Sequence, residues 1–394
     1  MGNQSSPCPT CRAAGNTPFF ALPGAPVFCN MLHDNRADAQ RAPRGDIRLA
    51  FCDRCGMIYN VAFEPERVAY DATYENALHC SHRFQRYARQ LAERLIEKHD
   101  LHGKPVAEIG CGDGYFLHLL RASGAGRAWG ADPGHWPHTH GHRDAGVTIV
   151  GQEFRADLLP EAVDLICCRH VLEHLPDPRT FLAEVHAAAS RGSDTVVFFE
   201  VPDAMFTLHH GGIWDILYEH CSYFTVPSLT RLFAESGFHV IDTTTAFGRQ
   251  FLGIEARAAT RPGAGRHGRD IPQLEKLAAQ VTYFQRKYQS ALDHWHALLA
   301  QRLQRGDRVV VWGAGTKGTM FLNTLSDARH IEHVVDINPR KTGTYVPCTA
   351  QQVVSPAALR ELRPDAIVVM NPLYETEIRQ SLKQLAVTAD LVVA

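Results

Sequence analysis

The chain has 394 residues, of which 45% are hydrophobic and 21% charged, so it holds enough apolar material for two or three domains and is not a disordered protein. Its 40 Lys and Arg residues nearly balance its 42 Asp and Glu residues, which argues against broad attraction to nucleic acid or an anionic membrane. No apolar run approaches the roughly 20 residues that span a bilayer, and the first residues lack the apolar core of a signal peptide. We therefore expect a cytoplasmic chain with neither nucleic-acid nor membrane partners.

Two closely spaced cysteine pairs mark the N-terminal part of the chain. Cys8 and Cys11, like Cys52 and Cys55, are separated by two residues, a spacing that lets both thiolates of a pair face one ion. Two such pairs complete a tetrahedral four-thiolate site, so we predict a structural Zn²⁺ there. The alternative is four unrelated cysteines, and Cys29 is either a spare ligand or a buried thiol.

The rest of the chain divides by its periodicity. Apolar residues at Phe84, Tyr87, Leu91 and Leu95 predict a helix, and strand-like and helix-like segments alternate from Lys104 onward, which indicates a parallel α/β sheet. A long polar and aromatic helix then precedes a second, smaller α/β unit. The expected parts are a zinc-binding domain at residues 1–68, an α/β domain with an N-terminal helical segment at 69–260, a helical linker at 261–305 and a Rossmann-like domain at 306–394.

A glycine-rich turn follows the first predicted strand of the larger α/β unit. Gly110, Gly112 and Gly114 end this strand and open a helix, so backbone amides at the helix N-terminus can approach a ligand closely. The spacing differs from the dinucleotide pattern G-x-G-x-x-G, and Glu108 suits the ammonium group of a ligand better than a pyrophosphate. Asp132 ends the next strand, where a carboxylate accepts hydrogen bonds from ribose hydroxyls.

With the downstream run His170–Pro178, these features resemble the class I S-adenosylmethionine-dependent methyltransferases. The whole chain resembles a narrower group, the three-domain sugar C-methyltransferases of deoxysugar biosynthesis. This resemblance implies a class I methyltransferase Rossmann-like domain flanked by an N-terminal zinc-binding domain and a C-terminal Rossmann-like α/β domain. It implies S-adenosylmethionine as methyl donor, and the donor-binding candidates are Glu108, Gly110, Gly112, Gly114, Asp132 and His170.

Carbon methylation in this family needs a base that removes a proton next to a ketone and groups that stabilise the enolate. A histidine, a carboxylate and two phenols lie together in residues 214–224. The family segment there is Tyr-x-Glu-His; Glu219 and His220 match it, Leu217 stands at the Tyr position, and Tyr218 is one place out of register. The catalytic candidates are His220, Glu219 and Tyr218, with His174, which matches the family's histidine after the fourth strand.

A second glycine-rich turn opens the C-terminal unit. Gly313, Gly315 and Gly318 fit G-x-G-x-x-G, and Lys317 adds a cation that suits a phosphate-bearing ligand. The resemblance implies that this domain holds the nucleotide part of a nucleotide-sugar; a scaffold that binds nothing and an NAD-dependent oxidoreductase are the alternatives. Tyr74 lies where the family's helical segment covers the active site, although aromatic packing explains it as well. The acceptor-binding candidates are Tyr74, Tyr223, Gly313, Gly315, Lys317 and Asn371.

The expected reaction is C-methylation of a nucleotide-linked keto-deoxysugar through an enolate. Departures from the family pattern at Leu217 and at residues 247–251 and 370–374 are expected near the acceptor. Leu217 and the altered Asn371–Pro372 run motivate the alternative, O- or N-methylation of another sugar or phosphorylated metabolite. A zinc-dependent nucleic-acid binder with a methyltransferase domain is a hypothesis of another class. Whether the chain is a monomer or a homodimer stays open, as does the choice between a metal site and a solvated segment for the histidines of residues 135–142.

Overall fold

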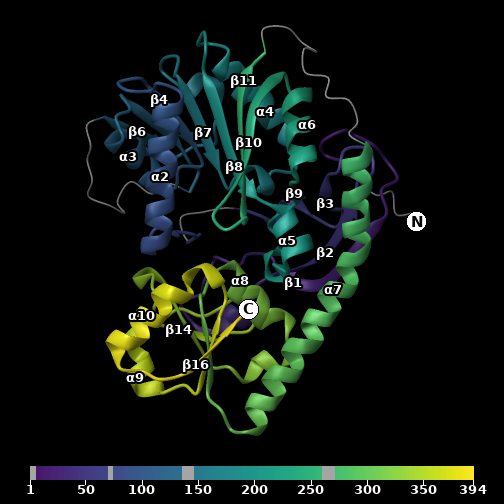
Figure 1. Cartoon of the computed structure of the whole chain (residues 1–394), viewed down its shortest axis with the longest axis vertical. Coiled ribbons are helices and arrows are strands. Elements are labelled where there is room, and N and C mark those ends of the chain that lie inside the picture. The colour runs from purple at the N-terminus through teal and green to yellow at the C-terminus, as the bar shows by residue number, and fades with distance from the viewer. Residues whose placement is uncertain (1–5, 70–73, 135–145, 260–270) are drawn as a thin grey trace.

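The computed structural model describes residues 6–69, 74–134, 146–259 and 271–394. Within these residues the strands form three sheets (Figure 1), of four, seven and five strands. The α/β class with two Rossmann-like sheets, expected from the sequence, is confirmed. Every helix among these residues is too short or too polar to cross a membrane.

The N-terminal sheet is antiparallel and has the order β1-β2-β3-β9. Its elements are β1 (Pro18–Pro26), α1 (Arg36–Gln40), β2 (Arg44–Phe51), β3 (Ile58–Asn60) and β9 (Ser222–Tyr223). The last strand, β9, follows β3 by more than 160 residues in the sequence and comes from within the central domain. Ile58 of β3 pairs with Tyr223 of β9. Because β9 directly follows the predicted catalytic segment, the N-terminal sheet fixes one end of that segment.

The central sheet has the order β10-β11-β8-β7-β4-β5-β6. It consists of β4 (Val106–Ile109), β5 (Ala128–Ala131), β6 (Val147–Val150), β7 (Leu165–Arg169), β8 (Val196–Pro202), β10 (Phe238–Ala246) and β11 (Phe251–Ala258). Strands β4 to β8 pair in parallel, and β10 and β11 extend the edge antiparallel. The strand order reverses at β4, and ligands bind at the carboxyl ends of the strands at such a switch point.

Helices cover both faces of the central sheet (Figure 1). They are α2 (His82–Lys98), α3 (Tyr115–Ala122), α4 (Pro178–Ala189) and α6 (Val226–Glu235), whereas α5 (Ala204–His210) packs against α7 (Ile271–Gln304) and shares a core with the N-terminal sheet. Buried residues of β7 alternate between the faces: Leu165 and Cys167 share a core with α2 and α3, whereas Ile166 and Cys168 share one with α4 and α6. Such nearly continuous apolar runs are typical of parallel strands buried on both faces.

The C-terminal sheet is parallel, with the order β14-β13-β12-β15-β16. Its elements are β12 (Val309–Trp312), α8 (Thr316–Thr324), β13 (His333–Val335), β14 (Gln352–Val354), α9 (Leu359–Leu362), β15 (Ala366–Val369), α10 (Glu375–Leu385) and β16 (Asp390–Val393). The predicted linker helix is α7 (Ile271–Gln304), which runs along one side of the molecule toward this sheet (Figure 1). Trp214, Trp295 and Phe321 pack edge to face in one core cluster, so the parts of the chain share buried surface.

A buried carboxylate fixes α2 to β11. Glu255 is 1% exposed; Lys98 Nζ lies 2.9 Å and His99 Nε2 2.7 Å from its Oε2, and Arg94 donates to its Oε1. Burial alone raises the pKa of Glu255, but hydrogen bonds from His99 and Arg94 outweigh burial and lower that pKa to about 2. The ion-paired carboxylate therefore stabilises the fold wherever it is charged.

Replacing this carboxylate, as Glu255→Gln, should lower the free energy of unfolding at pH 7 by about 2 kcal/mol. Because the folded-state pKa lies below the ordinary value of 4.5, the contribution is present above pH 4.5 and is lost as the pH falls toward 2. Urea unfolding at pH 7 and pH 3 measures it, with exposed Glu93→Gln on the same helix as control. An equal difference at both pH values would contradict the assignment.

Candidate functional site

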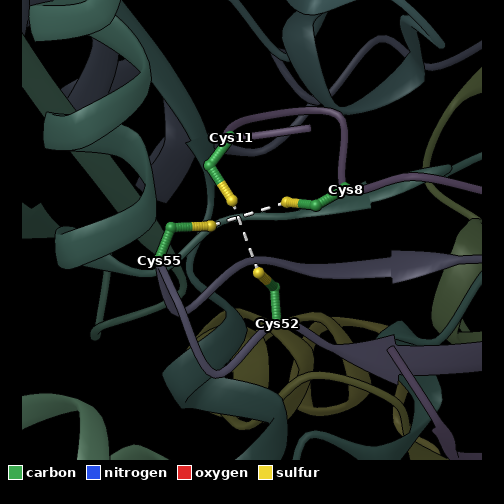
Figure 2. Close-up of side chains that lie close together, drawn as sticks. All are labelled: Cys8, Cys11, Cys52 and Cys55. Atoms are coloured by element: carbon green, nitrogen blue, oxygen red, sulfur yellow. Dashed lines mark hydrogen bonds between the residues drawn. The ribbon is translucent and has the colours of Figure 1, made fainter. Parts of the chain in front are cut away.

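The four N-terminal cysteines point their sulfur atoms at one another (Figure 2). Their Sγ atoms all lie within 4.8 Å of one another, with Cys8–Cys55 and Cys11–Cys52 at 3.5 Å. Gly56 has a φ of +76° and donates its N–H to the carbonyl of Cys52 at 2.8 Å, which closes the turn around the second pair.

Four soft donors from two turns, with no position left for a substrate, are the donor set of a structural zinc site. The four cysteines lie together, as the prediction of one shared site requires. Cys29 lies apart from the cluster, since its backbone N–H binds Glu219.

The first glycine-rich turn joins three strand ends. Gly110 follows β4, Asp132 follows β5, and Val171 follows β7. Gly112 donates its N–H to Asp132 Oδ2 at 2.8 Å, so the carboxylate is oriented by the turn itself. Gly110 has a φ of +69°, and a Cβ there would stand 2.2 Å from Val171 Cγ2. The turn is thus closely packed, as expected for a backbone that approaches a ligand.

Glu108 lies beneath this turn and is only 2% exposed. Its Oε1 accepts a hydrogen bond from Arg169 Nε at 3.2 Å, and the guanidinium stands 3.9 Å from the centroid of the Phe116 ring. Burial raises the pKa of Glu108 to about 7 although Arg169 opposes this shift. Sequence reasoning assigned Glu108 to a ligand's ammonium group and missed its protein partner. A lone Arg within the apolar strand β7 was the available signal.

His170 belongs to the same buried charge cluster. It has a φ of 57°, its Nε2 lies 3.2 Å from Glu200 Oε1, and its Nδ1 lies 3.6 Å from Glu173 Oε1. Burial favours the neutral ring, but the two carboxylates raise the pKa of His170 to about 9. Tyr87 on α2 donates to the other oxygen of Glu200. His170 is therefore held among protein carboxylates.

Glu219, a predicted catalytic residue, has no exposed surface. Its Oε1 accepts the backbone N–H of Cys29 at 3.0 Å, and its Oε2 accepts the Tyr74 hydroxyl at 2.7 Å. Burial raises the pKa of Glu219, although Tyr74 and Cys29 stabilise its charged form. Tyr74, predicted to bind the acceptor, is thereby brought into contact with a predicted catalytic residue.

The two predicted catalytic histidines face each other beside this carboxylate. Their ring centroids are 4.8 Å apart and the rings are edge to face. His174 Nδ1 lies 3.1 Å from the backbone carbonyl of Glu219, so Nδ1 carries the proton. Burial lowers the pKa of His220 well below its ordinary value, which keeps this ring neutral and able to accept a proton. Ligand atoms of Glu173 and both histidines lie within 4.8 Å of one another.

The hydroxyl groups of the segment's two phenols bind the backbone, although the Tyr223 ring stands edge to face on the His220 ring, with centroids 6.1 Å apart. The Tyr218 hydroxyl accepts the backbone N–H of Glu64 at 3.0 Å, and its ring packs against Phe63. The catalytic role assigned to Tyr218 is therefore not supported, because a shift of one residue along an extended segment turns the side chain to the opposite side. The Tyr223 hydroxyl accepts from and donates to the backbone of Leu217 at 2.9 and 2.8 Å, so it fastens the loop instead of facing a ligand.

At the second glycine-rich turn, Gly313 has a φ of +119° and Ala314 donates its N–H to Asp336 Oδ2 at 2.8 Å. A Cβ on Gly318 would meet the carbonyl oxygen of Gly313 at 1.9 Å, which explains that glycine. Lys317, predicted to meet a phosphate, instead forms an ion pair with Asp215 of the central domain. Sequence reasoning had no signal for this pair, because its members lie far apart in the chain.

Residues 247–251 and 370–374, which depart from the family pattern, contact each other. Gln250 Nε2 donates to Asn371 Oδ1, and Asn371 Nδ2 donates to Gln250 Oε1, both at 3.0 Å. The side-chain amide of Asn371, a residue predicted to bind the acceptor, is thus hydrogen-bonded to a side chain of the β10–β11 turn. Phe247 stacks on Phe251 at 4.9 Å beside this pair. The histidines at positions 135, 138, 140 and 142 lie outside the described residues.

Comparison with known proteins agrees with this arrangement. A family model described as "Methyltransferase domain" matches residues 80–243, and one described as "C-methyltransferase C-terminal domain" matches residues 273–394. C-methyltransferase NovU of Streptomyces niveus is 26% identical over 96% of this chain and 93% of its own length. Ubiquinone biosynthesis O-methyltransferase of Pseudomonas syringae pv. tomato is 32% identical, over 27% of this chain and 47% of its own length.

Among solved structures, the chain is similar to 1,6-didemethyltoxoflavin-N1-methyltransferase of Burkholderia thailandensis, which is described with bound S-adenosylhomocysteine. The identity is 21% and the TM-score 0.36, over 44% of this chain and 78% of that one.

The packing of the first turn predicts the effect of adding one methyl group. Gly110→Ala adds both left-handed strain and a clash with Val171, so we expect the affinity for S-adenosylhomocysteine to fall at least about tenfold in calorimetry. Gly103→Ala is the matched control, since Gly103 has a φ of +71° and open space around its Cβ position. Equal affinities in the two variants would remove the turn from the donor site.

Proposed function

Given that the chain is an S-adenosylmethionine-dependent methyltransferase, we propose that it methylates a carbon atom of a nucleotide-linked keto-deoxysugar. The observation that carries this proposal is the cluster of His174, His220 and the buried carboxylate of Glu173, whose ligand atoms lie within 4.8 Å of one another. His174 binds the backbone carbonyl of Glu219, whose carboxylate accepts the Tyr74 hydroxyl, and burial lowers the pKa of His220, which keeps it neutral and able to accept a proton. Similarity to NovU along nearly the whole chain supports transfer to carbon.

In the proposed reaction, His220 removes a proton from the carbon next to the ketone, and the C–H electron pair becomes the enolate double bond. The enolate carbon attacks the methyl group of the donor's sulfonium; the S–CH₃ bond breaks, and its electron pair stays on the sulfur of the S-adenosylhomocysteine that leaves. Tyr74 and Cys29 hold Glu219 in place, and the Glu219 carbonyl orients the His174 ring. The proton taken by His220 then leaves to solvent.

For the donor, we assign the turn of Gly110, Gly112 and Gly114 to the methionine part and Asp132 to the ribose hydroxyls. Glu108 and His170 support this turn from beneath, as members of the buried charge cluster that includes Arg169. For the acceptor, we assign the nucleotide end to the turn of residues 313–318.

We propose domain boundaries at residues 68, 260 and 305. We also propose that the enzyme acts in the cytoplasm as a monomer or homodimer.

We also propose that Cys8, Cys11, Cys52 and Cys55 hold a structural zinc ion, as their closed four-sulfur arrangement supports. Metal analysis of the purified chain should find about one zinc per chain. Cys52→Ser should lose the zinc and lower the melting temperature by roughly 5–10 °C, since zinc binding contributes to folding. Cys348→Ser, at a half-buried thiol outside the cluster, should keep both. Full zinc content in Cys52→Ser would refute the site.

The proposed reaction is tested by exchange of the proton next to the ketone. With a nucleotide-linked 4-keto-deoxysugar in deuterated buffer, the wild-type enzyme should incorporate deuterium without net turnover when S-adenosylhomocysteine replaces the donor. His220→Asn should slow this exchange by about 10²-fold or more, in line with the usual worth of a general base, and leave binding of S-adenosylhomocysteine within about twofold. Exposed His102→Asn is the control.

Mass spectrometry with a labelled methyl donor completes the test. A mass shift on an acceptor that has no ketone, without proton exchange, would overturn C-methylation and establish the O- or N-methylation alternative. The amide pair of Gln250 and Asn371 is the observation that favours that alternative, because it changes a surface expected to touch the acceptor.

A further inference from the structure

The buried carboxylate of Glu219 has three supports, and each of them contacts the C-terminal domain. The supports are the loop that carries Glu219, the Cys29 amide bound to Oε1, and the Tyr74 hydroxyl bound to Oε2. None of these three supports is itself part of the C-terminal domain. The contacts all come from residues 317–340, which begin in the second glycine-rich turn and end just after β13.

The first contact holds the loop. Lys317 pairs with Asp215 at the end of the short 3₁₀ helix Ile213–Asp215, four residues before Glu219. Both side chains are largely enclosed, at 17% and 20% exposure, so this pair is screened less than a surface ion pair. Trp214 next to it packs on Phe321 of α8, which makes the attachment firm.

The second contact holds the Cys29 segment. Thr319 on α8 is fully buried and donates its hydroxyl to the carbonyl of Cys29 at 3.1 Å. The backbone of Cys29 therefore accepts a hydrogen bond from the C-terminal domain through its carbonyl and donates one to Glu219 through its N–H. A displacement of α8 moves the amide that binds the carboxylate.

The third contact holds Tyr74 through its neighbour. Glu75 accepts from Asn338 Nδ2 at 3.0 Å and pairs with Arg340 Nε at 2.9 Å, and its backbone N–H binds the carbonyl of Asn30 at 3.1 Å. Asn338 in turn donates its own N–H to Asp336, the carboxylate that also accepts from the second turn.

We propose that Lys317, Thr319, Asn338 and Arg340 are positioning residues for Glu219, and that a nucleotide bound at the second turn sets the geometry of the catalytic carboxylate. The nucleotide as the ligand rests on the proposed function; the mechanical link rests only on the contacts above. Binding of the nucleotide, the remote end of the acceptor, then helps to align the reacting end. An acceptor without its nucleotide should lose turnover rate as well as affinity.

Hydrogen exchange of the ligand-free full chain tests the link without any substrate. Arg340→Gln removes the ion pair to Glu75, and Lys317→Met removes that to Asp215. In each variant we expect the Cys29 amide, which binds Glu219, to exchange about tenfold faster than in the wild type, as resolved by peptide mass spectrometry. Arg329→Gln, an exposed arginine of the same domain, is the matched control. Wild-type exchange in both variants overturns the proposal.

Turnover separates positioning from general destabilisation. Arg340→Gln should lower kcat about tenfold with an unchanged KM for the methyl donor, and Glu75→Gln should do the same. The double variant should be no worse than either single one, because both changes remove the same contact. Additive losses would overturn the link. If the acceptor is not a nucleotide-keto-sugar, no variant methylates it, yet the difference in exchange at Cys29 persists, so the two failures are distinguishable.

Discussion

A carboxylate without exposed surface must be hydrogen-bonded inside the protein, since its desolvation is otherwise uncompensated. Glu219 meets this requirement with a backbone amide from the N-terminal module and a hydroxyl from the segment before α2. Neither donor is near it in sequence. The three parts of the chain therefore have to be assembled before the carboxylate is enclosed, and much of their mutual arrangement follows from that need.

A second buried charge cluster lies below the donor turn. Arg169 is placed between Glu108 and Glu200, and His170 between Glu200 and Glu173. Removing one member of such a cluster leaves an uncompensated charge and costs more than the pair itself contributes. The cluster joins the donor turn to the histidine pair through one contiguous set of side chains. Under the proposed function, donor binding and acceptor chemistry therefore share structural supports.

Local spacing predicted the parts of the site that are local. Cys8 with Cys11, the turn at Gly110 and the carboxylate of Asp132 depend on neighbours within a few residues or on the regular order of parallel strands. The partners of Tyr218 and Lys317, which are Glu64 and Asp215, could not be predicted because they lie far away in the chain. Side-chain direction at an irregular loop depends on such partners. The family resemblance supplied residue types for this loop but not its altered register.

The pairing of β3 with β9 has a consequence for the order in which the chain is made. β3 ends at Asn60, whereas β9 begins at Ser222, so during synthesis one edge of the N-terminal sheet waits for its partner while the residues between them emerge. An unpaired edge invites pairing with another chain. Early closure of the cysteine cluster would hold β2 and β3 in a compact hairpin over this interval. The N-terminal module thus begins folding first and is completed only after most of the central domain has left the ribosome.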